Sequence, residues 1–291
     1  MRIAFASGKG GAGKTTLTAQ ISRVWPEACA LADCDVEAPN LHLFLHPNRK
    51  TSFSVSLEVP KAVLAHCTGC GQCRTICRYG AIALFGTKIA VFSDMCHGCG
   101  GCFAVCSEHA LEMGERTIGQ IDIGALADGT PFFSGTTRIG EVMTPPLLRR
   151  LLHELDSCTL DQLVDGPPGV SCPAVTVANH CDGLVLVVEP TPFGFADFKL
   201  AVQAFLAVHK PLVCVINRSG LPGNDATEEA VCTFCAQKGL PIAGRIPFSR
   251  KAAATLAQGE LLADDQFYDL ARAIHAHFHT VCEGTREVRH G

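Results

Sequence analysis

The sequence predicts an α/β fold in which a mainly parallel sheet is covered by helices on both faces and a small cysteine-rich domain is inserted. Near-continuous apolar stretches recur at residues 183–188, 212–216 and 242–246. Helical stretches such as residues 196–208 and 227–238 separate them. Buried parallel strands have continuous apolar sequences, and their crossover connections place helices on both faces of the sheet. Two repeated cysteine runs precede this alternating part and indicate the insert.

The chain begins with a predicted strand at residues 2–6, a glycine-rich loop and a predicted helix at residues 17–24. Lys14 and Thr15 stand at the offsets of a phosphate-binding loop. The glycines let backbone N–H groups surround an anion, Lys14 reaches the outer phosphates, and the Thr15 hydroxyl can ligate magnesium. We therefore predict a P-loop NTPase whose phosphate-binding residues are Gly8, Gly10, Gly11, Ala12, Gly13, Lys14, Thr15 and Thr16.

Two acidic segments follow later predicted strands. Asp33 and Asp35 come after the apolar stretch at residues 28–32, and Asp165 closes another short apolar stretch. Ligands of open α/β sheets bind beyond the carboxyl ends of the strands, and magnesium is held by carboxylates and water. We expect these carboxylates to lie beside the phosphates. Asp161 matches no motif, and we interpret it as a solvated residue.

Both cysteine runs have the spacing C-x-x-C-x-x-C-x-x-x-C, which is typical of bacterial ferredoxins with four-iron clusters. In that pattern the fourth cysteine of each run ligates the other cluster. The first predicted 4Fe-4S cluster is held by Cys67, Cys70, Cys73 and Cys106. The second is held by Cys96, Cys99, Cys102 and Cys77. Zinc is the alternative, because paired thiolates also suit a tetrahedral zinc ion.

The predicted ferredoxin-like insert extends over residues 59–118, so the nucleotide-binding domain is discontinuous and consists of residues 1–58 and 119–291. Segments 51–57 and 131–139 alternate between apolar and polar residues or carry β-branched residues. We predict that they form edge strands leading out of the main sheet.

The run from Lys9 to Thr16, K-G-G-A-G-K-T-T, resembles the deviant phosphate loop of the MinD, ParA, Mrp and nitrogenase iron-protein group. In that group the earlier lysine reaches the nucleotide of the partner subunit. The resemblance therefore implies a homodimer, or a heterodimer with a related ATPase, in which Lys9 offsets charge on the transferred phosphoryl group. A solvated Lys9 beside an anion site is the alternative.

Three further segments look like MinD-type ATPases that carry an inserted ferredoxin domain, and the likeness covers essentially the whole chain. They are residues 33–41 (D-C-D-V-E-A-P-N-L), 165–173 (D-G-P-P-G-V-S-C-P) and 189–194 (E-P-T-P-F-G). The resemblance implies a cytoplasmic, ATP-binding iron–sulfur protein that hydrolyses ATP with magnesium.

The same resemblance implies roles for individual residues. Asp35 would orient the attacking water, so the catalytic residues would be Lys9, Lys14 and Asp35. Magnesium would be held through Thr15, Asp33 and Asp165. The adenine base would be read by Asn217 and Arg218 and flanked by Pro247 and Phe248, although Asn-Arg at a strand end is also common in loops.

Charge and hydropathy exclude some partners. The formal net charge of −4 gives no electrostatic reason to expect nucleic acid. No stretch reaches the roughly 18 apolar residues needed to span a bilayer, and Met1 leads directly into a strand rather than a cleavable leader. We expect a cytoplasmic protein. The amphipathic last helix, around residues 267–281, is expected to pack on the core, with a membrane-binding tail as the alternative.

Of the 17 cysteines, eight belong to the two runs and nine lie elsewhere. Cys232 and Cys235 stand at helical i, i+3 spacing and could bridge a cluster across a dimer, as in Mrp-type carriers, or be buried and inert. Cys172 follows the Asp165 loop, where it could line the dimer interface. The others are interpreted as packing residues: Cys29, Cys34, Cys158, Cys181, Cys214 and Cys282.

Connectivity suggests the functional hypothesis. A switch segment at Asp35 that responds to the γ-phosphate precedes the cluster domain in the chain, so ATP could gate electron transfer to a redox partner. One alternative is an ATPase that assembles clusters or delivers them to an apo iron–sulfur acceptor. Another is an ATP-dependent synthetase of the cobyrinic acid amidation type, against which Lys9 and the cysteine runs argue.

Overall fold

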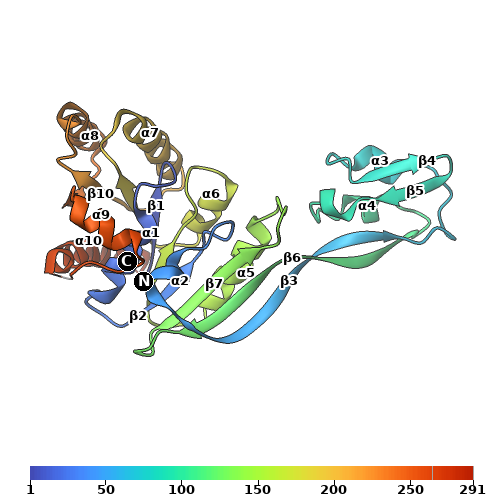
Figure 1. Cartoon of the computed structure of the whole chain (residues 1–291). Coiled ribbons are helices and arrows are strands. Elements are labelled where there is room, and N and C mark those ends of the chain that lie inside the picture. Colours follow the sequence, from blue (N-terminus) through green and yellow to red (C-terminus); the bar gives the residue numbers. More distant parts are fainter. Residues whose placement is uncertain (264, 291) are drawn as a thin grey trace. The chain divides into compact units, whose positions relative to one another are not determined.

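The computed structural model describes residues 1–263 and 265–290, with side chains described up to residue 282. The chain forms two compact units (Figure 1). The first unit comprises Met1–Ser52, Ile121–Thr136 and the chain from Leu148 onward, and the second comprises Phe53–Gln120 and Thr137–Leu147. The second unit is wider than the predicted insert of residues 59–118, because two long strands continue into it and residues 137–147 belong to it.

A nine-stranded sheet has the order β11-β10-β9-β1-β8-β2-β7-β6-β3. The strands of its first-unit part are β1 (Arg2–Ser7), β2 (Cys29–Asp33), β7 (Pro131–Thr137), β8 (Asp161–Asp165), β9 (Gly183–Val188), β10 (Leu212–Ser219) and β11 (Ile242–Pro247). β1 pairs in parallel with β8 and β9, β2 with β7 and β8, and β10 with β9 and β11. The predicted mainly parallel sheet is confirmed.

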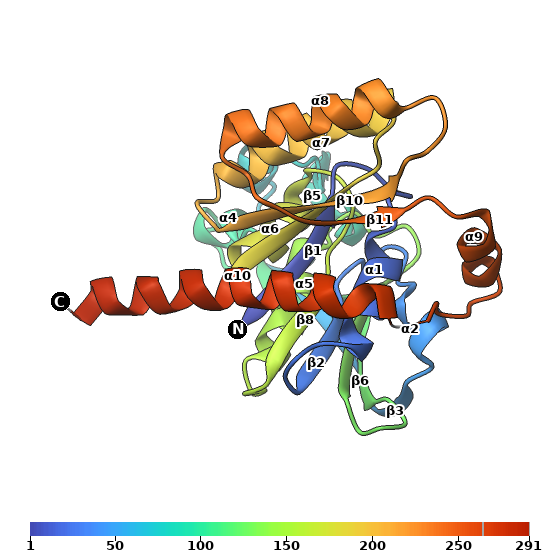
Figure 2. The ribbon, with the colours of Figure 1, turned by 90° about the vertical axis from the view of Figure 1, so that its left-hand side faces the viewer.

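Helices cover this sheet. They are α1 (Lys14–Arg23), α2 (Leu41–Leu45), α5 (Pro145–Leu155), α6 (Cys172–Asn179), α7 (Pro192–Leu206), α8 (Asp225–Lys238), α9 (Arg250–Ala257) and α10 (Asp265–His290). Figure 2 shows α7 and α8 on one face of the sheet and α1 and α10 on the other. No helix in the described part of the chain is both long and apolar enough to cross a membrane.

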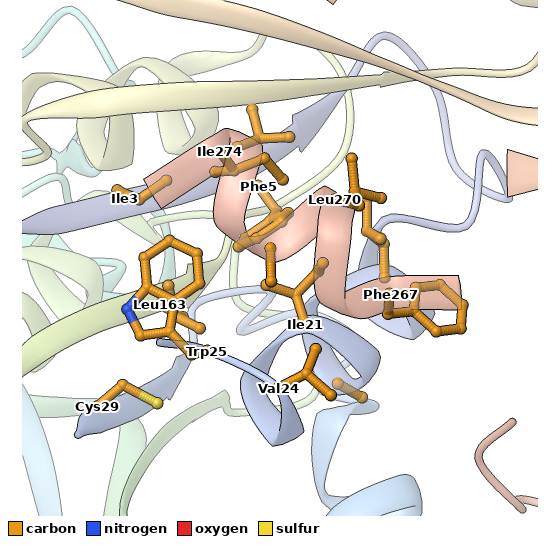
Figure 3. Packing of buried hydrophobic residues seen from close by; sticks show 14 of the residues in the cluster. Ile3, Phe5, Ile21, Val24, Trp25, Cys29, Leu163, Phe267, Leu270 and Ile274 are labelled. Atoms are coloured by element: carbon orange, nitrogen blue, oxygen red, sulfur yellow. The ribbon is translucent and has the colours of Figure 1, made fainter. Parts of the chain in front are cut away.

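The main hydrophobic core joins α10 to α1 and to the strands (Figure 3). Phe267, Ile274 and Phe278 are at most 2% exposed. Full burial of one such side chain contributes about 1.5–3 kcal/mol. α10 approaches β9 so closely that a Cβ at Gly183 would collide with the Phe278 ring. The expectation that the last helix packs on the core is therefore confirmed.

Two sequence-based expectations are wrong. Segment 131–139 was expected at a sheet edge, but β7 lies between β2 and β6, and its Phe132 and Phe133 are buried. Asp161 is not solvated: it accepts hydrogen bonds from the Met1 amino group at 2.8 Å and from Trp25 Nε1 at 2.9 Å. Both differences arise from contacts between segments far apart in the chain.

The second unit contains the far ends of β3 (Asn48–Ala62) and β6 (Leu111–Ala125) together with a small cysteine-rich body. Its other elements are α3 (Gln72–Ile76), β4 (Ile82–Phe85), β5 (Lys88–Val91), a 3₁₀ turn (Ser93–Met95) and α4 (Gly101–Ala104). β4 and β5 form an antiparallel pair. Each cysteine run forms a loop that leads into a short helix, α3 or α4.

Candidate nucleotide site and cysteine pockets

The phosphate loop connects the end of β1 at Ser7 to the start of α1 at Lys14. Gly13 has a φ of 91°, and an added Cβ there would collide with the side-chain nitrogen of Asn217. Asn217 Nδ2 donates to the Ala12 carbonyl oxygen at 2.8 Å. Asn217, predicted to read adenine, therefore also fixes the end of the phosphate loop from β10.

Gly13→Ala is expected to destabilise the protein and to prevent nucleotide binding, because the new Cβ strains a left-handed backbone and displaces Asn217. Left-handed strain alone costs about 1–3 kcal/mol. Gly129→Ala is the matched control: Gly129 has a φ of 90°, and no described atom lies within 4 Å of its hypothetical Cβ. Thermal unfolding and ADP titration compare the two variants. Normal ADP binding by Gly13→Ala would contradict this account.

The carboxyl ends of β2 and β8 bring the predicted acidic residues together, since the parallel register pairs Asp33 with Asp165. Both residues are 0% exposed. Lys14 Nζ lies 2.6 Å from Asp165 Oδ1, and Thr15 Oγ1 donates to Asp165 Oδ2 at 2.7 Å. Asp33 accepts from the Leu41 amide at 2.9 Å and from the Asp35 amide at 3.2 Å. Asp33 thus holds the segment that carries Asp35.

Asp33 and Asp35 have raised pKa values. Burial, and then the neighbouring Asp165, raises the pKa of Asp33 to about 8. Burial raises the pKa of half-buried Asp35 to about 6, although Lys14 opposes the shift. Two adjoining carboxylates and a hydroxyl are the hard oxygen ligands that magnesium prefers, so Thr15, Asp33 and Asp165 fit the predicted ion. A bound divalent cation would favour the ionised carboxylates.

The contribution of Asp33 to the free energy of unfolding is expected to fall as pH rises from about 4 to about 8 in magnesium-free buffer. The raised pKa means that folded Asp33 keeps a proton that the unfolded chain releases near its ordinary pKa. Asp33→Asn removes this dependence, so its stability relative to the wild type should increase across that range. Urea unfolding at several pH values tests this, with exposed Asp269→Asn as control. A pH-independent difference between variant and wild type would contradict the assignment.

A cavity of about 650 Å³ adjoins the phosphate loop. The predicted residues that line it are Gly13, Thr16, Asn217, Arg218, Pro247 and Phe248. The structure therefore brings all four proposed base-binding residues to one cavity. Leu256 of α9 and Phe267 of α10 contribute to its apolar wall, and no sequence motif predicts either of them as a site residue.

Glu189 is a further site residue, and its motif did not predict a role for it. Its Oε1 lies 2.8 Å from Arg218 Nη1, and its Oε2 lies 3.6 Å from Lys9 Nζ. Glu189 therefore joins the motif lysine to a proposed base-binding residue within one chain. The available signal was its position directly after β9, at the start of the E-P-T-P segment.

In the second unit, each predicted cluster ligand set lines its own pocket. One pocket is lined by Cys67, Cys70, Cys73 and Cys106, together with Ile89 and Val105. The other is lined by Cys77, Cys96, Cys99 and Cys102, together with Pro60 and Phe103. In both pockets the fourth cysteine comes from the other run. Among the described residues, however, no group of three or more His, Cys, Asp or Glu side chains is arranged so that it could hold a metal ion.

The two cysteine loops have the same backbone design. Gly69 and Gly71 flank Cys70, Gly98 and Gly100 flank Cys99, and all four glycines have φ between 65° and 75°. Backbone amides also point at sulfur: the Gly98 amide donates to Cys96 Sγ at 3.4 Å and the Ala110 amide to Cys106 Sγ at 3.3 Å. Amide donors to sulfur stabilise and tune thiolate-bound clusters. The four thiols that line each pocket are the type of donor that four-iron clusters take.

Comparisons with known proteins agree with the fold of the nucleotide site. The MinD cell division protein of Aquifex aeolicus is 18% identical with a TM-score of 0.55, over 94% of this chain and 96% of that one. MinD of Pyrococcus horikoshii OT3, solved with Mg-ADP, is 18% identical with a TM-score of 0.56, over 94% and 95%. Uncharacterized protein MJ0578 of Methanocaldococcus jannaschii is 30% identical over 224 residues, 76% of this chain and 79% of its own length. The model of the CobQ/CobB/MinD/ParA nucleotide binding domain matches residues 3–262, so the chain belongs to this family.

Proposed function

We propose that this protein is a magnesium-dependent ATPase whose nucleotide state gates electron transfer through two 4Fe-4S clusters. One observation carries the proposal. The chain has the nucleotide binding domain of the CobQ/CobB/MinD/ParA family and also has two pockets, each lined by four cysteines that come from both runs. Clusters bound there would supply one-electron transfer to a redox partner. The switch segment after β2 leads through α2 into β3, which gives a short covalent path between the two functions.

The residues of the nucleotide site have distinct tasks in this proposal. Lys14 meets the outer phosphates, while Thr15, Asp33 and Asp165 hold magnesium. Asp35 is the residue that orients the attacking water, and a pKa of about 6 leaves it largely ionised at neutral pH.

Lys9 completes the site across a dimer. Its ammonium group would leave Glu189 and reach the nucleotide of a partner subunit, where it would offset the charge on the transferred phosphoryl group. The resemblance of this loop to that of the nitrogenase iron protein supports the dimer, which joins two copies of this chain or this chain and a related ATPase.

Asp35→Asn is expected to lower the rate of ATP hydrolysis about 100-fold or more while ATP binding is retained, because an amide cannot accept the proton of the attacking water. Glu37→Gln is the control, since Glu37 is an exposed acid two residues away. Phosphate release and ATP titration give the two readouts. Hydrolysis by Asp35→Asn at half the wild-type rate would exclude this role.

The gating step is tested on anaerobically purified protein that contains iron and sulfide. Reduction by a reduced viologen dye is followed by stopped flow without nucleotide, with ADP, with ATP, and with ATP on Asp35→Asn. Rates that differ between ADP and ATP support gating, and Asp35→Asn separates the effect of ATP binding from that of hydrolysis. Equal rates in all four conditions would remove the gating claim.

Cluster delivery is the second candidate function. The observation that favours it is the exposure of Cys70 and Cys99, one from each pocket, because an exposed thiolate ligand can exchange with an acceptor thiol. Incubation with an apo-ferredoxin separates the two functions. Transfer of iron and sulfide to the acceptor supports delivery, and their retention supports electron transfer.

A further inference from the structure

Three cysteines outside the two runs lie together in the first unit. Cys214 on β10 and Cys235 on α8 are at most 1% exposed, and their thiols are hydrogen-bonded to each other. Cys232 precedes Cys235 by one turn of the same helix and is half-buried. Its Sγ accepts a hydrogen bond from Arg245 Nη2 at 3.1 Å. One partly exposed cysteine therefore lies beside a guanidinium group, and two buried cysteines lie near it.

Arg245 is held in place from its other side. Its Nε lies 3.7 Å from Glu228, whose carboxylate accepts hydrogen bonds from Ser219 Oγ at 2.5 Å and from the Gly220 amide at 2.8 Å. The hydrogen bond to Cys232 raises the pKa of Arg245. The Arg245 guanidinium supplies a partner for negative charge on sulfur, and a neighbouring cation is typical of reactive cysteines.

The buried pair has a different role. The hydrogen bond between Cys214 and Cys235, with burial, holds the pKa of Cys214 well above its usual range, and the same bond lowers the pKa of Cys235. Cys214 therefore stays a thiol and assists ionisation of Cys235. Cys235 is the better nucleophile of the buried pair.

We propose that Cys232 and Cys235 form a reversible dithiol–disulfide site that is oxidised by peroxides. The Cys232 thiolate attacks a peroxide oxygen, the O–O bond breaks, and the sulfur becomes a sulfenic acid as hydroxide leaves. Cys235 then attacks that sulfur, which forms the S–S bond and releases the second oxygen as water. Two thiols lose two electrons and two protons, and hydrogen peroxide becomes two water molecules. An added dithiol reductant reverses the change by thiol–disulfide exchange.

Helix geometry permits this bond. Side chains at i and i+3 share a face with Cβ atoms about 5–6 Å apart, whereas a disulfide needs about 3.5–4.5 Å. The bond therefore needs a local distortion of the helix that brings the two Cβ atoms roughly 1–2 Å closer. Cys232 and Cys235 lie in the last two turns of α8, and helix ends fray, so such a distortion disturbs little of the helix.

A single peptide reports the reaction. Trypsin releases Ser219–Lys238, which contains Cys232 and Cys235 but not Cys214. The whole protein is exposed to hydrogen peroxide, alkylated and digested. We expect this peptide to lose both alkylation sites and two hydrogen atoms, and a dithiol reductant to restore them. Cys235→Ser should instead accumulate a sulfenic acid on Cys232 that dimedone labels.

Arg245→Met is expected to slow oxidation of this peptide about tenfold, because the cation beside the attacking sulfur is lost. Arg272→Met, an exposed arginine on α10, is the matched control and should oxidise at the wild-type rate. The proposal is overturned by a Cys214–Cys235 disulfide in place of the predicted one, by Arg245→Met reacting as fast as the wild type, or by Cys232 reacting no faster than exposed Cys172.

Discussion

Lys14→Met is expected to abolish ATP hydrolysis, with kcat reduced about 1,000-fold or more. The Lys14 ammonium lies 2.6 Å from Asp165 and is only 6% exposed, so it neutralises a carboxylate that has no access to solvent. In the proposed mechanism the same cation meets the outer phosphates, where loss of a positioned charge costs about 100-fold to 100,000-fold in rate. The rate of phosphate release in the presence of magnesium and ATP measures the change in kcat.

Two further variants make this result interpretable. Loss of one partner of a buried ion pair costs about 3–5 kcal/mol, so Lys14→Met could lose activity by unfolding. Lys14→Arg keeps the positive charge and the buried pair but changes its geometry, and it should remain folded with strongly reduced hydrolysis. Lys238→Met, at the exposed end of α8, controls for loss of a lysine elsewhere. A folded Lys14→Met protein with normal hydrolysis would refute the nucleotide-site assignment.

The features predicted correctly are encoded by short stretches of sequence. The phosphate loop needs a strand, a few glycines, Lys14 and Thr15 in one short segment, so spacing alone predicts it. Asp33 and Asp165 are far apart in the chain, but parallel strands bring their carboxyl ends to one edge. That topological rule predicts from the sequence that the two acids lie together.

The features that were missed depend on contacts between distant segments. Glu189 becomes a site residue only because the fold brings Lys9 and Arg218 to it. Asp161 is half-buried because Met1 and Trp25 bind it, and neither partner is suggested by its local sequence. α9 is a helix of 8 residues, and its place beside the cavity depends on how the fold positions it rather than on its own sequence.

The cysteine pockets show an intermediate case. Spacing predicted which sulfurs share a pocket, including the exchange of Cys77 and Cys106 between runs, and the pocket linings agree with it. Spacing does not reveal the amide donors to Cys96 and Cys106, because these depend on loop conformation.

Because the fourth cysteine of each run is predicted to ligate the cluster of the other run, two matched double variants should differ in the number of clusters that they retain. Cys70→Ala with Cys106→Ala removes two ligands from one predicted pocket, although these cysteines belong to different runs. It should leave one complete cluster and about half of the eight irons expected for two four-iron clusters. Cys99→Ala with Cys106→Ala takes one ligand from each pocket and should leave no cluster with four thiolates.

The iron and sulfide content per chain is measured for both variants. Electron paramagnetic resonance spectra of the reduced proteins show which clusters remain. Cys70 and Cys99 are both exposed, so the two variants disturb packing to a similar degree, and Cys158→Ala with Cys172→Ala controls for cysteines outside the runs. If each run held its own cluster, the outcomes would be reversed, because Cys99 and Cys106 would then belong to one site. Wild-type protein that binds zinc without sulfide would exclude both arrangements and leave a nucleotide-binding protein with structural metal sites.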